Sequence, residues 1–520
     1  MALTREPNTR EMMVPIIMKV ATVRRGARRT RAVALPAFGL DRASEVPLYR
    51  QLYEALRQAI LEGRLRPGAR LPSTRVLAAE LGSSRNTVLT AVAQLAAEGY
   101  LAGRVGAGTT VRDTLPEALV HASPGAALPA GGAGATAGLS RRGRQLIRAR
   151  LGARLGLPAR PFRPGAPAYD DNAIARWAKL TARHWGRVSR QLLDYGDPLG
   201  FAPLREAIAT YLREARAVRC EAEQVVVVSG SQHGLDLAAR LLLDPGDRAW
   251  IEDPGYLGAR GALLAAGARV VPVPVDADGL DVARGMNAAP DARLAYVTPS
   301  HQYPLGVTMS LDRRLALLRW AQARRAWIVE DDYDSEYRYT GRPLASLQGL
   351  DRRGRVIYVG TFSKVLFPAL RLGYVVVPSP LVDAFAAARG LVDRHPPSVT
   401  QAVLAEFIAE GSFARHVRRM RVRYGEQQAA LVAAAGKRLA GVLEVGPAEA
   451  GMHLVGWLPA GSDDRAASAA ARQAGVEAPA LSAFRLRRAG RGGLLLGYAA
   501  WSPDELWEGA ATLAGALGAP

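Results

Sequence analysis

One lysine of this sequence stands in a setting suited to covalent chemistry with a carbonyl group. Lys364 lies in the run GTFSKVLFPALRLGY, just after an apolar stretch with the character of a strand. A lysine where a strand meets a loop, beside small hydroxyl residues, can form a Schiff base with an aldehyde cofactor. Thr361 and Ser363 offer hydroxyls and Arg371 offers a guanidinium fork, which together suit a phosphate dianion. The run therefore predicts a site for a phosphorylated aldehyde.

Residues from three other segments can complete such a pocket. Asp331 ends the apolar run WIVED, and a carboxylate there can keep a pyridine nitrogen protonated, which makes the ring an electron sink. Tyr333 can donate to a phenolic oxygen of the ring, and Tyr256, in the run EDPGY, can stack on its face. The run VVVVSGSQ places Ser231 and Gln232 at the start of a helix, where backbone amides form a cradle for phosphate.

The elements that must position these residues are short apolar strands that alternate with helices. Such a pattern is typical of a parallel sheet covered by helices on both faces. Ligands bind at the carboxyl ends of the strands in sheets of this kind, which is where Asp331 stands. The expected strands are 225–228, 249–252, 269–273, 295–297, 327–330, 356–360 and 374–377. Residues from about 396 onward are mostly helical in pattern, with one apolar strand at 494–497, and predict a smaller α+β lobe.

Each of these segments has a plainer interpretation when it is taken alone. Surface lysines are abundant, residues 331–334 can form a solvated acidic loop, and Tyr256 can belong to a hydrophobic core. It is the order and spacing of the segments together that indicate a single pocket.

With that order and spacing, residues from about 195 to 378 resemble a fold-type I aminotransferase. The runs SGSQHGLDL, EDPGY, VTPSHQYPLG, EDDYDSEYRY and GTFSKVLFPALRLGY are similar to those of the MocR/GabR group of regulators. The resemblance implies pyridoxal 5'-phosphate as the cofactor, with Lys364 as its Schiff-base lysine and Asp331 as the partner of the ring nitrogen. It also implies Tyr333 as the phenol-oxygen partner and Tyr256 as the stacking ring. The phosphate shell that it implies consists of Ser231, Gln232, Thr361, Ser363 and Arg371.

The chain departs from the aminotransferase pattern at the effector end of the pocket. His301 and Gln302 stand where ordinary aminotransferases carry an asparagine-containing motif, and Leu305 replaces a commoner threonine. These departures argue against efficient transamination, and His301 is either an effector contact or a structural hydrogen-bonding residue. The run GLLLGYAAW contains no arginine to hold an effector's carboxylate. Arg485 and Arg491 are therefore the candidates, with surface charges as the alternative.

Residues 44–113 carry the pattern of a small helical unit. An apolar residue recurs at every fourth position of its first helix, at Leu48, Leu52, Leu56 and Ile60. Ser73 is placed to cap a second, short helix. The third helix has an inward stripe, at Val88, Val92 and Leu95. This register leaves Arg85 exposed at the N-terminal end, and residues 100–111 then predict two short strands around a glycine-rich tip.

The run LPSTRVLAAELGSSRNTVLTAVAQLAAEGYLAGRVGAGTTV resembles the GntR-type winged helix-turn-helix along its whole length. The resemblance implies double-stranded DNA as the partner, with the third helix at base edges and the glycine-rich wing at the minor groove or at phosphates. The contacts that it implies are Arg75, Arg85, Thr87 and Arg104, with Ser73 and Gly106 close by. Surface salt bridges are the alternative for Arg75 and Arg85.

The composition of the whole chain is compatible with these assignments. The 520 residues carry a formal net charge of +21, which suits a polyanionic partner but also arises from genome composition. Cys220 is the single cysteine, so an intramolecular disulfide is excluded, and it is expected to be a small buried side chain. No apolar run reaches the length of a membrane span, and residues 12–23 have their basic cluster on the wrong side for a signal peptide. We therefore expect a cytoplasmic protein with no membrane contact.

We expect four segments along the chain. Residues 1–43 form a basic, disordered extension, with a DNA-binding arm as the alternative, and residues 44–113 form the winged helix-turn-helix. Residues 114–160 form a linker rich in Ala, Gly and Pro. The linker contains a basic cluster that is either a solvated charge run or a DNA contact, namely Arg141, Arg142 and Arg144. Residues 161–520 form the α/β fold-type I transferase-like domain, with its large part at about 195–390 and its small lobe at about 396–520.

Three functions are compatible with this organisation. The first is a transcription regulator whose pocket binds an amino acid or amine and thereby changes DNA affinity. The second is a working aminotransferase anchored to DNA, and the third is a regulator that senses pyridoxal phosphate itself. The complete DNA-binding unit argues against the second. A homodimer on paired DNA half-sites is expected, because fold-type I sites are usually completed by a second subunit.

Overall fold

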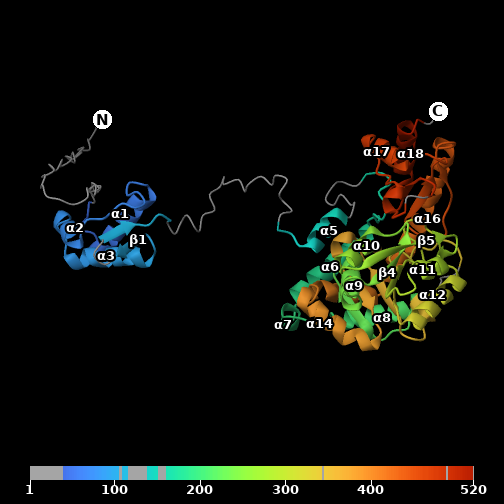
Figure 1. Cartoon of the computed structure of the whole chain (residues 1–520), viewed down its shortest axis with the longest axis horizontal. Coiled ribbons are helices and arrows are strands. Elements are labelled where there is room, and N and C mark those ends of the chain that lie inside the picture. Colours follow the sequence, from blue (N-terminus) through green and yellow to red (C-terminus); the bar gives the residue numbers. More distant parts are fainter. Residues whose placement is uncertain are drawn as a thin grey trace, which may run out of the picture. The chain divides into compact units, whose positions relative to one another are not determined.

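The computed structural model describes residues 39–104, 108–114, 138–149, 160–341, 345–487 and 490–518. The chain forms two compact units, residues 1–135 (unit 1) and residues 136–520 (unit 2). Within the described ranges, none of the helices combines the length and the apolar character that a membrane crossing requires. Figure 1 labels the elements of both units.

Unit 1 consists of three helices followed by a two-stranded hairpin. Its elements are α1 (Leu48–Leu61), α2 (Thr74–Glu80), α3 (Arg85–Ala97), β1 (Leu101–Arg104) and β2 (Gly108–Val111). Two serines cap the second and third helices, because Oγ of Ser73 accepts the Val76 amide and Oγ of Ser84 accepts the Thr87 amide. The two strands pair antiparallel. The three helices and the hairpin predicted from the sequence are confirmed.

The core of unit 1 comes from the inward faces of these helices, as predicted from the apolar residue at every fourth position of the first helix. Leu52 and Leu56 of α1 are fully buried, and so are Val88 and Leu95 of α3. Val92, the third predicted member of the α3 stripe, packs against this core but is only half-buried, whereas its neighbour Ala91 is fully buried. Positions three and four residues apart share a helix face, so Val88, Ala91 and Leu95 lie on the buried side of α3.

Unit 2 is built around an eight-stranded sheet of order β3-β10-β9-β8-β7-β4-β5-β6. Its strands are β3 (Val225–Val228), β4 (Arg248–Asp253), β5 (Arg269–Asp276), β6 (Gly279–Leu280), β7 (Leu294–Val297), β8 (Trp327–Asp332), β9 (Val356–Thr361) and β10 (Gly373–Val376). All seven strands predicted in this region are present to within a few residues. The parallel sheet predicted for them needs one correction, because β10 runs antiparallel to both β3 and β9. Residues 362–372, which join β9 to β10, are too short for the helical crossover that a parallel pair requires.

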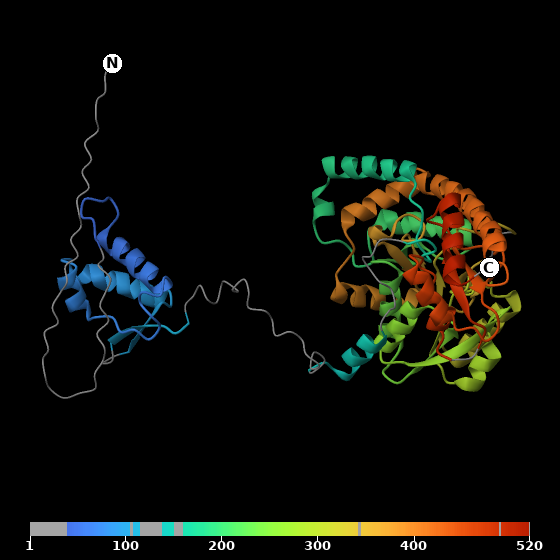
Figure 2. The same cartoon turned by 90° about the horizontal axis from the view of Figure 1, so that it is seen from above.

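Helices cover both faces of this sheet (Figures 1 and 2). They are α8 (Ala202–Arg216), α9 (Ser231–Leu242), α10 (Leu257–Ala265), α11 (Val282–Ala288), α12 (Leu311–Arg324), α13 (Leu347–Leu350), α14 (Val382–Val392) and α15 (Ser398–Ala409). Alternate residues of β3 enter different cores, since Val225 and Val227 pack with α8 and α15 whereas Val226 and Val228 pack with α9 and α10. The strands are therefore buried on both sides, as their continuous apolar runs predict.

A smaller lobe follows, with a three-stranded antiparallel sheet of order β11-β12-β13. Its elements are α16 (Ser412–Arg438), β11 (Glu444–Val445), β12 (His453–Trp457), α17 (Asp464–Gln473), β13 (Gly493–Gly497) and α18 (Pro503–Ala516). The backbone of Phe162, from far earlier in the chain, pairs with Gly497 at the end of β13. Residues just before the large sheet thus pack on the small lobe. The smaller α+β lobe predicted from the sequence is confirmed.

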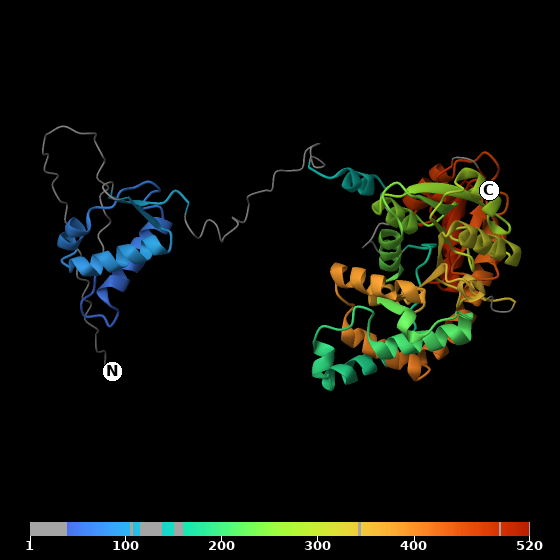
Figure 3. The ribbon, with the colours of Figure 1, turned by 60° about the horizontal axis from the view of Figure 1, so that its bottom comes forward.

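The stretch predicted to be a linker contains a helix. Helix α5 (Arg141–Ala149) packs on α10 of unit 2 (Figures 1 and 3) and carries the basic cluster of Arg141, Arg142 and Arg144, all exposed. Residues 115–137 and 150–159 of that stretch lie outside the described residues, as does most of the predicted extension. Two further helices, α6 (Asp171–Gly186) and α7 (Arg190–Leu193), lead to α8.

Candidate functional site

Lys364 lies in the loop after β9 and contacts a backbone carbonyl from the start of unit 2. Its Nζ donates a hydrogen bond of 2.7 Å to the carbonyl oxygen of Gly165. Gly165 has φ +71°, which L side chains rarely adopt, and a Cβ there would stand 2.7 Å from Nζ, so a larger residue would be strained and would push the lysine tip away. Burial lowers the pKa of Lys364, which Asp334 opposes and the charge of Arg163 reinforces. A lowered pKa raises the fraction of neutral amine, which is the form that attacks a carbonyl.

Asp331, near the end of β8, is almost fully buried, and only one of its two carboxylate oxygens has a hydrogen-bond partner among the described residues. Its Oδ2 accepts a hydrogen bond of 2.8 Å from the hydroxyl of Tyr296, whereas its Oδ1 has no hydrogen-bond partner among the described residues. Burial raises the pKa of Asp331 to about 7, and the bond from Tyr296 opposes that rise. A buried carboxylate oxygen without a partner is costly. A protonated ring nitrogen would satisfy it, so this residue fits the cofactor that the sequence implies.

Tyr333, just after β8, is held by His301. The Nδ1 of His301 lies 2.9 Å from the hydroxyl of Tyr333 and 3.0 Å from Oδ2 of Asp334. The imidazole is 2% exposed, and its Nε2 has no partner among the described residues. Gly451 leaves room for this ring, because a Cβ there would lie 2.4 Å from Nε2. His301 therefore positions Tyr333, in line with the structural alternative that the sequence left open.

The predicted phosphate shell lies where β3 and β9 end, on either side of the start of β10. Gly373 at the start of β10 pairs with Thr361 on one side and with Val228 on the other. Nη2 of Arg371 donates a bond of 3.0 Å to the carbonyl of Ser229, two residues before the start of α9.

Two further features make the predicted phosphate shell suitable for an anion. Gly230, which precedes α9, has φ +89°, and a Cβ there would stand 3.2 Å from the guanidinium of Arg371. The hydroxyl of Ser363 is buried without a partner among the described residues, whereas Oγ1 of Thr361 accepts the Ser363 amide at 3.1 Å. A helix N-terminus, a guanidinium and an unsatisfied hydroxyl together suit a phosphate.

Tyr256 links the phosphate shell to the ring-binding residues. It directly precedes α10, and its hydroxyl lies 3.4 Å from Oε1 of Gln232. The ring of Tyr303 makes edge contacts with Tyr256 and with Tyr333, each at 5.9 Å between centroids. Gln232 also donates to the carbonyl of Gly258 at 2.9 Å. The predicted residues from four separate segments are thus brought together.

Sequence reasoning missed several residues that hold this site. Tyr296 was not singled out, although it is the aromatic hydroxyl in an otherwise apolar strand. Gly165 and Arg163 stand before the first expected strand, and no motif marked them. Glu252 is buried and accepts bonds from Thr298 and Gln302, so the unusual Gln302 has a structural role.

The two arginines expected to hold an effector are engaged within the small lobe. Nη1 of Arg491 lies 2.8 Å from Oε2 of Glu444, and its Nε donates to the carbonyl of Leu458 at 2.7 Å. Arg485 donates to the carbonyl of Arg491 at 2.8 Å and lines a separate cavity with the start of α17. Among the described residues, neither arginine forms a hydrogen bond or ion pair with Lys364 or Asp331, so this expectation receives no support from the structure.

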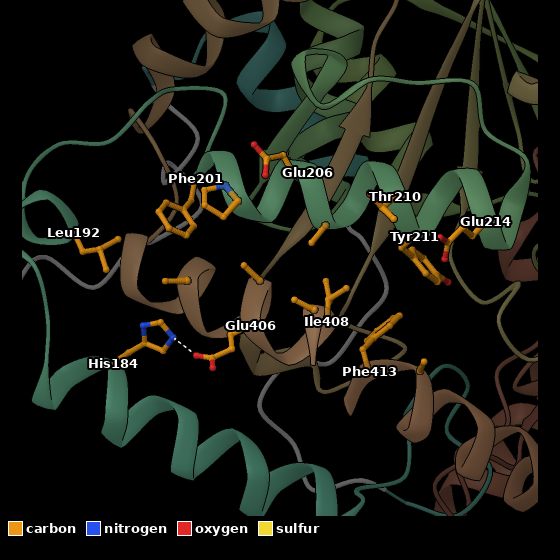
Figure 4. Close-up of a pocket in the computed structure, with 16 residues that line it drawn as sticks. His184, Leu192, Phe201, Glu206, Thr210, Tyr211, Glu214, Glu406, Ile408 and Phe413 are labelled. Atoms are coloured by element: carbon orange, nitrogen blue, oxygen red, sulfur yellow. Dashed lines mark hydrogen bonds and ion pairs between the residues drawn. The ribbon is translucent and has the colours of Figure 1, made fainter. Parts of the chain in front are cut away.

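A cavity of about 710 Å³ lies elsewhere in unit 2, between α6, α8 and α15 (Figure 4). Its wall is mainly apolar, with Phe201 and Phe413 facing it, and His184 is bonded to Glu406 at its edge (Figure 4). None of the predicted cofactor residues lines it. The buried atoms of Asp331 and Ser363 that have no hydrogen-bond partner among the described residues, rather than this cavity, therefore mark the candidate cofactor site.

The predicted DNA contacts are displayed on α2 and α3 of unit 1. Arg75 and Arg85 are exposed, and neither has an ion pair with any described residue, so the salt-bridge alternative is not observed. Thr87 is half-buried, and its hydroxyl lies 2.8 Å from Oγ of Ser84. Arg104 ends β1. The side chain of Arg104 and the whole of Gly106 lie outside the described residues.

Comparisons with protein families match both units. Residues 48–111 match the family described as Bacterial regulatory proteins, gntR family, and residues 164–512 match Aminotransferase class I and II. The probable rhizopine catabolism regulatory protein MocR of Rhizobium meliloti is 45% identical over 482 residues, 92% of this chain and 95% of its own. The HTH-type transcriptional regulator TauR of Rhodobacter capsulatus is 40% identical over 402 residues, 76% of this chain and 80% of its own.

Solved structures match unit 2. Kynurenine aminotransferase of Pyrococcus horikoshii, solved with PMP, has a TM-score of 0.65 and 26% identity over 75% of this chain and 96% of its own. LysN of Thermus thermophilus, solved with N-(5'-phosphopyridoxyl)-L-leucine, has a TM-score of 0.64 and 28% identity over 75% of this chain and 97% of its own. The chain therefore belongs to the MocR-type family of transcription regulators, in which a GntR-family DNA-binding domain is joined to a domain of aminotransferase class I and II.

Proposed function

We propose that the protein is a pyridoxal-phosphate-binding transcription regulator that senses an amino acid or amine. Unit 1 would bind promoter DNA in the bacterial cytoplasm, and unit 2 would bind the cofactor and the effector. The observation that carries this is Oδ1 of Asp331, a buried carboxylate oxygen without a partner among the described residues, in a chain that also has a GntR-family domain. Related proteins named as regulators of rhizopine catabolism and pyridoxine biosynthesis support a regulatory function.

The residues of the pocket have separate tasks in this proposal. Arg371 and the start of α9 would hold the phosphate, and Asp331 would hold a proton on the ring nitrogen. When bound, the cofactor would supply an aldehyde that condenses with amines and an electron-withdrawing ring. Lys364 would provide one such amine, and Tyr333 would donate to the phenolic oxygen. Tyr256 would cover the ring and exclude water from one face.

An effector acts on DNA binding only if it binds two states of the protein with different affinity. The bond from Nζ of Lys364 to the carbonyl of Gly165 is that of a free lysine amine, so an effector amine that took the place of Lys364 on the cofactor would leave Nζ free to make it. The segment around Gly165 also pairs with the small lobe through Phe162 and Gly497. This supports a mechanism in which effector binding at Lys364 changes how the small lobe is held.

The working aminotransferase is the weaker alternative. The final strand β13 carries no arginine, and His301 is engaged with Tyr333 and Asp334 in the described structure. A regulator that senses the cofactor itself differs from our proposal only in lacking an effector response. Titration with amines and amino acids separates the two.

A homodimer forms part of the proposal. Leu391 and Tyr195 are 89% and 75% exposed, and Leu193 and Val392 beside them are also exposed. Arg394 lies over the ring of Tyr195 at 4.7 Å, so the two loops adjoin. An apolar patch of this kind on a folded protein supports an interface, and a second copy of the chain would cover it.

The experiment that tests the cofactor assignment uses the full chain and its Lys364→Ala variant. The wild-type protein loaded with pyridoxal phosphate should absorb visible light, and borohydride should fix the cofactor on Lys364 alone. The variant should keep its fold by circular dichroism and lose the covalent label. Label on a different lysine, or none on the wild-type protein, would refute the assignment.

A further inference from the structure

A carboxylate at the end of β4 fastens a loop of the small lobe to the large sheet. Oδ1 of Asp253 accepts the Leu486 amide at 2.7 Å, and its Oδ2 accepts the Arg487 amide at 3.0 Å. Both oxygens of one side chain thus bind successive amides of residues 484–487 (the clasp loop). Asp253 is 9% exposed, and no described residue forms an ion pair with it. A buried carboxylate costs free energy unless it is bonded, and these two charge-assisted bonds offset that cost.

The clasp loop also holds the turn that leads to Tyr256. The Gly255 amide donates to the carbonyl of Phe484 at 3.1 Å. The turn is tight, because a Cβ at Gly255 would stand 2.2 Å from the carbonyl oxygen of Glu252. Tyr256 follows directly and caps the start of α10. Its position therefore depends on the bonds that fix this turn.

Side chains of the clasp loop also contact the large part of unit 2. Leu486 and Tyr256 pack against the same hydrophobic core, the one that contains residues of α9 and α10. The ring of Phe484 makes an edge contact with the ring of Tyr303, at 5.5 Å between centroids. Tyr303 in turn contacts Tyr256 and Tyr333, the two residues predicted beside the cofactor ring. Backbone bonds and ring contacts thus connect the clasp loop to the ring-binding residues.

The clasp loop is anchored in the small lobe just before it begins. The amide and the hydroxyl of Ser482 donate to Oδ2 and Oδ1 of Asp464, at the start of α17, at 2.9 and 2.6 Å. Ala480 forms a bridge with Leu494 of β13. The loop therefore follows the small lobe, and a shift of that lobe would reach the turn before Tyr256.

We propose that Asp253 is a positioning residue, which holds Tyr256 against the cofactor ring by fastening the small lobe to the turn before it. This rests on the proposed function, in which Tyr256 covers the ring. The state of the small lobe and the affinity for the cofactor are then linked, and such a link acts equally in both directions. It gives the proposed regulation a second contact between pocket and small lobe, besides the pairing of Phe162 with Gly497.

The test uses the full chain as wild type, Asp253→Asn and Leu486→Ala, each with and without the further substitution Tyr256→Leu. Asparagine has the shape of aspartate but only one acceptor oxygen, so it cannot accept both backbone amides. Leu486→Ala loosens the same loop without changing the turn. Asp504→Asn, at an exposed position in the first turn of α18, is the matched control. The Kd of pyridoxal phosphate is measured from its visible spectrum, and the clasp loop is followed by hydrogen exchange.

We expect Asp253→Asn to raise the Kd of pyridoxal phosphate by roughly three- to tenfold, as for the loss of one aromatic contact. With Tyr256→Leu present, the same substitution should change the Kd by less than about twofold, because a residue that acts through the Tyr256 ring has no effect once the ring is gone. Leu486→Ala should act in the same direction by a smaller factor, and Asp504→Asn should behave as the wild type. Cofactor binding should slow hydrogen exchange of the clasp loop in the wild type and not in Asp253→Asn.

Equal rises in Kd with and without the Tyr256 ring would overturn the proposal, because Asp253 would then act by another route. An Asp253→Asn variant with the Kd and the exchange of the wild type would also overturn it, while leaving the cofactor assignment standing. If Asp253→Asn does not fold, Leu486→Ala decides in the same way. Failure of the proposed function looks different, because the wild type would then carry no cofactor on Lys364, and this inference would fall with it.

Discussion

The buried carboxyl group of Asp331 couples the stability of the cofactor-free protein to pH. Burial raises its pKa to about 7, from an ordinary value near 4. The folded protein therefore holds a proton that the unfolded chain releases between about pH 4 and pH 7. This contribution to the free energy of unfolding is complete below that window and is lost as the pH rises through it. Glu252, Glu330 and Glu336, whose pKa values burial also raises to about 7, act in the same direction.

Asp331→Asn should accordingly make the cofactor-free protein less sensitive to pH. We expect its unfolding temperature to fall less than that of the wild type between pH 5 and pH 8, with the remaining fall due to the three glutamates. The same variant should bind pyridoxal phosphate at least roughly tenfold more weakly, because a charge-assisted bond is lost. Asp312→Asn, at an exposed position in the first turn of α12, is the control. An unchanged pH profile in Asp331→Asn would contradict the buried, protonated carboxyl group.

For single residues, a role in the site could be predicted from the sequence where the residue lies in a motif. It could not be predicted where the residue only supports a motif residue from another part of the chain. Lys364 and Asp331 stand in runs whose chemistry is readable without a structure. Tyr296 meets Asp331 only because β7 pairs with β8, across 35 positions of sequence. Gly165 is still less visible, because its role depends on a hydrogen bond with Lys364 across 199 positions of sequence.

Among the secondary-structure elements, α3 depends on its cap for both stability and DNA contact. The Oγ of Ser84 accepts the Thr87 amide at 3.1 Å, and Arg85 follows directly at the exposed start of the helix. Ser84→Ala should lower the local free energy of unfolding of α3 by about 1 kcal/mol, as measured by hydrogen exchange. DNA affinity should fall with it, because Arg85 loses its fixed position. Ser83→Ala is the control, because the buried hydroxyl of Ser83 has no partner among the described residues. A larger loss of α3 stability in Ser83→Ala than in Ser84→Ala would contradict the capping role of Ser84.

The elements themselves were predicted well where local pattern decides them. Apolar runs predicted the strands of the large sheet, and the apolar residue at every fourth position predicted α1. The direction of β10 was missed, because strand direction depends on the connection through residues 362–372 and not on the strand's own residues. Helix α5 was missed because the Ala, Gly and Pro around it dominate the composition, while its packing on α10 is a tertiary contact.

For the whole molecule, the dimer proposal makes the DNA-binding units act in pairs. Leu391→Asp places a charge in the exposed apolar patch next to Tyr195 and should weaken self-association by roughly 30-fold or more, the loss typical of a central interface residue. In sedimentation experiments at micromolar concentration we expect the wild type to be a dimer and the variant mainly a monomer. Binding to DNA with two half-sites should fall accordingly, and binding to one half-site should not change. Val422→Asp, on the exposed face of α16, is the control for adding a charge at an exposed apolar position. A wild-type monomer would refute the dimer. A Leu391→Asp variant that remains a dimer would refute this interface and would imply that another face of unit 2 forms the dimer.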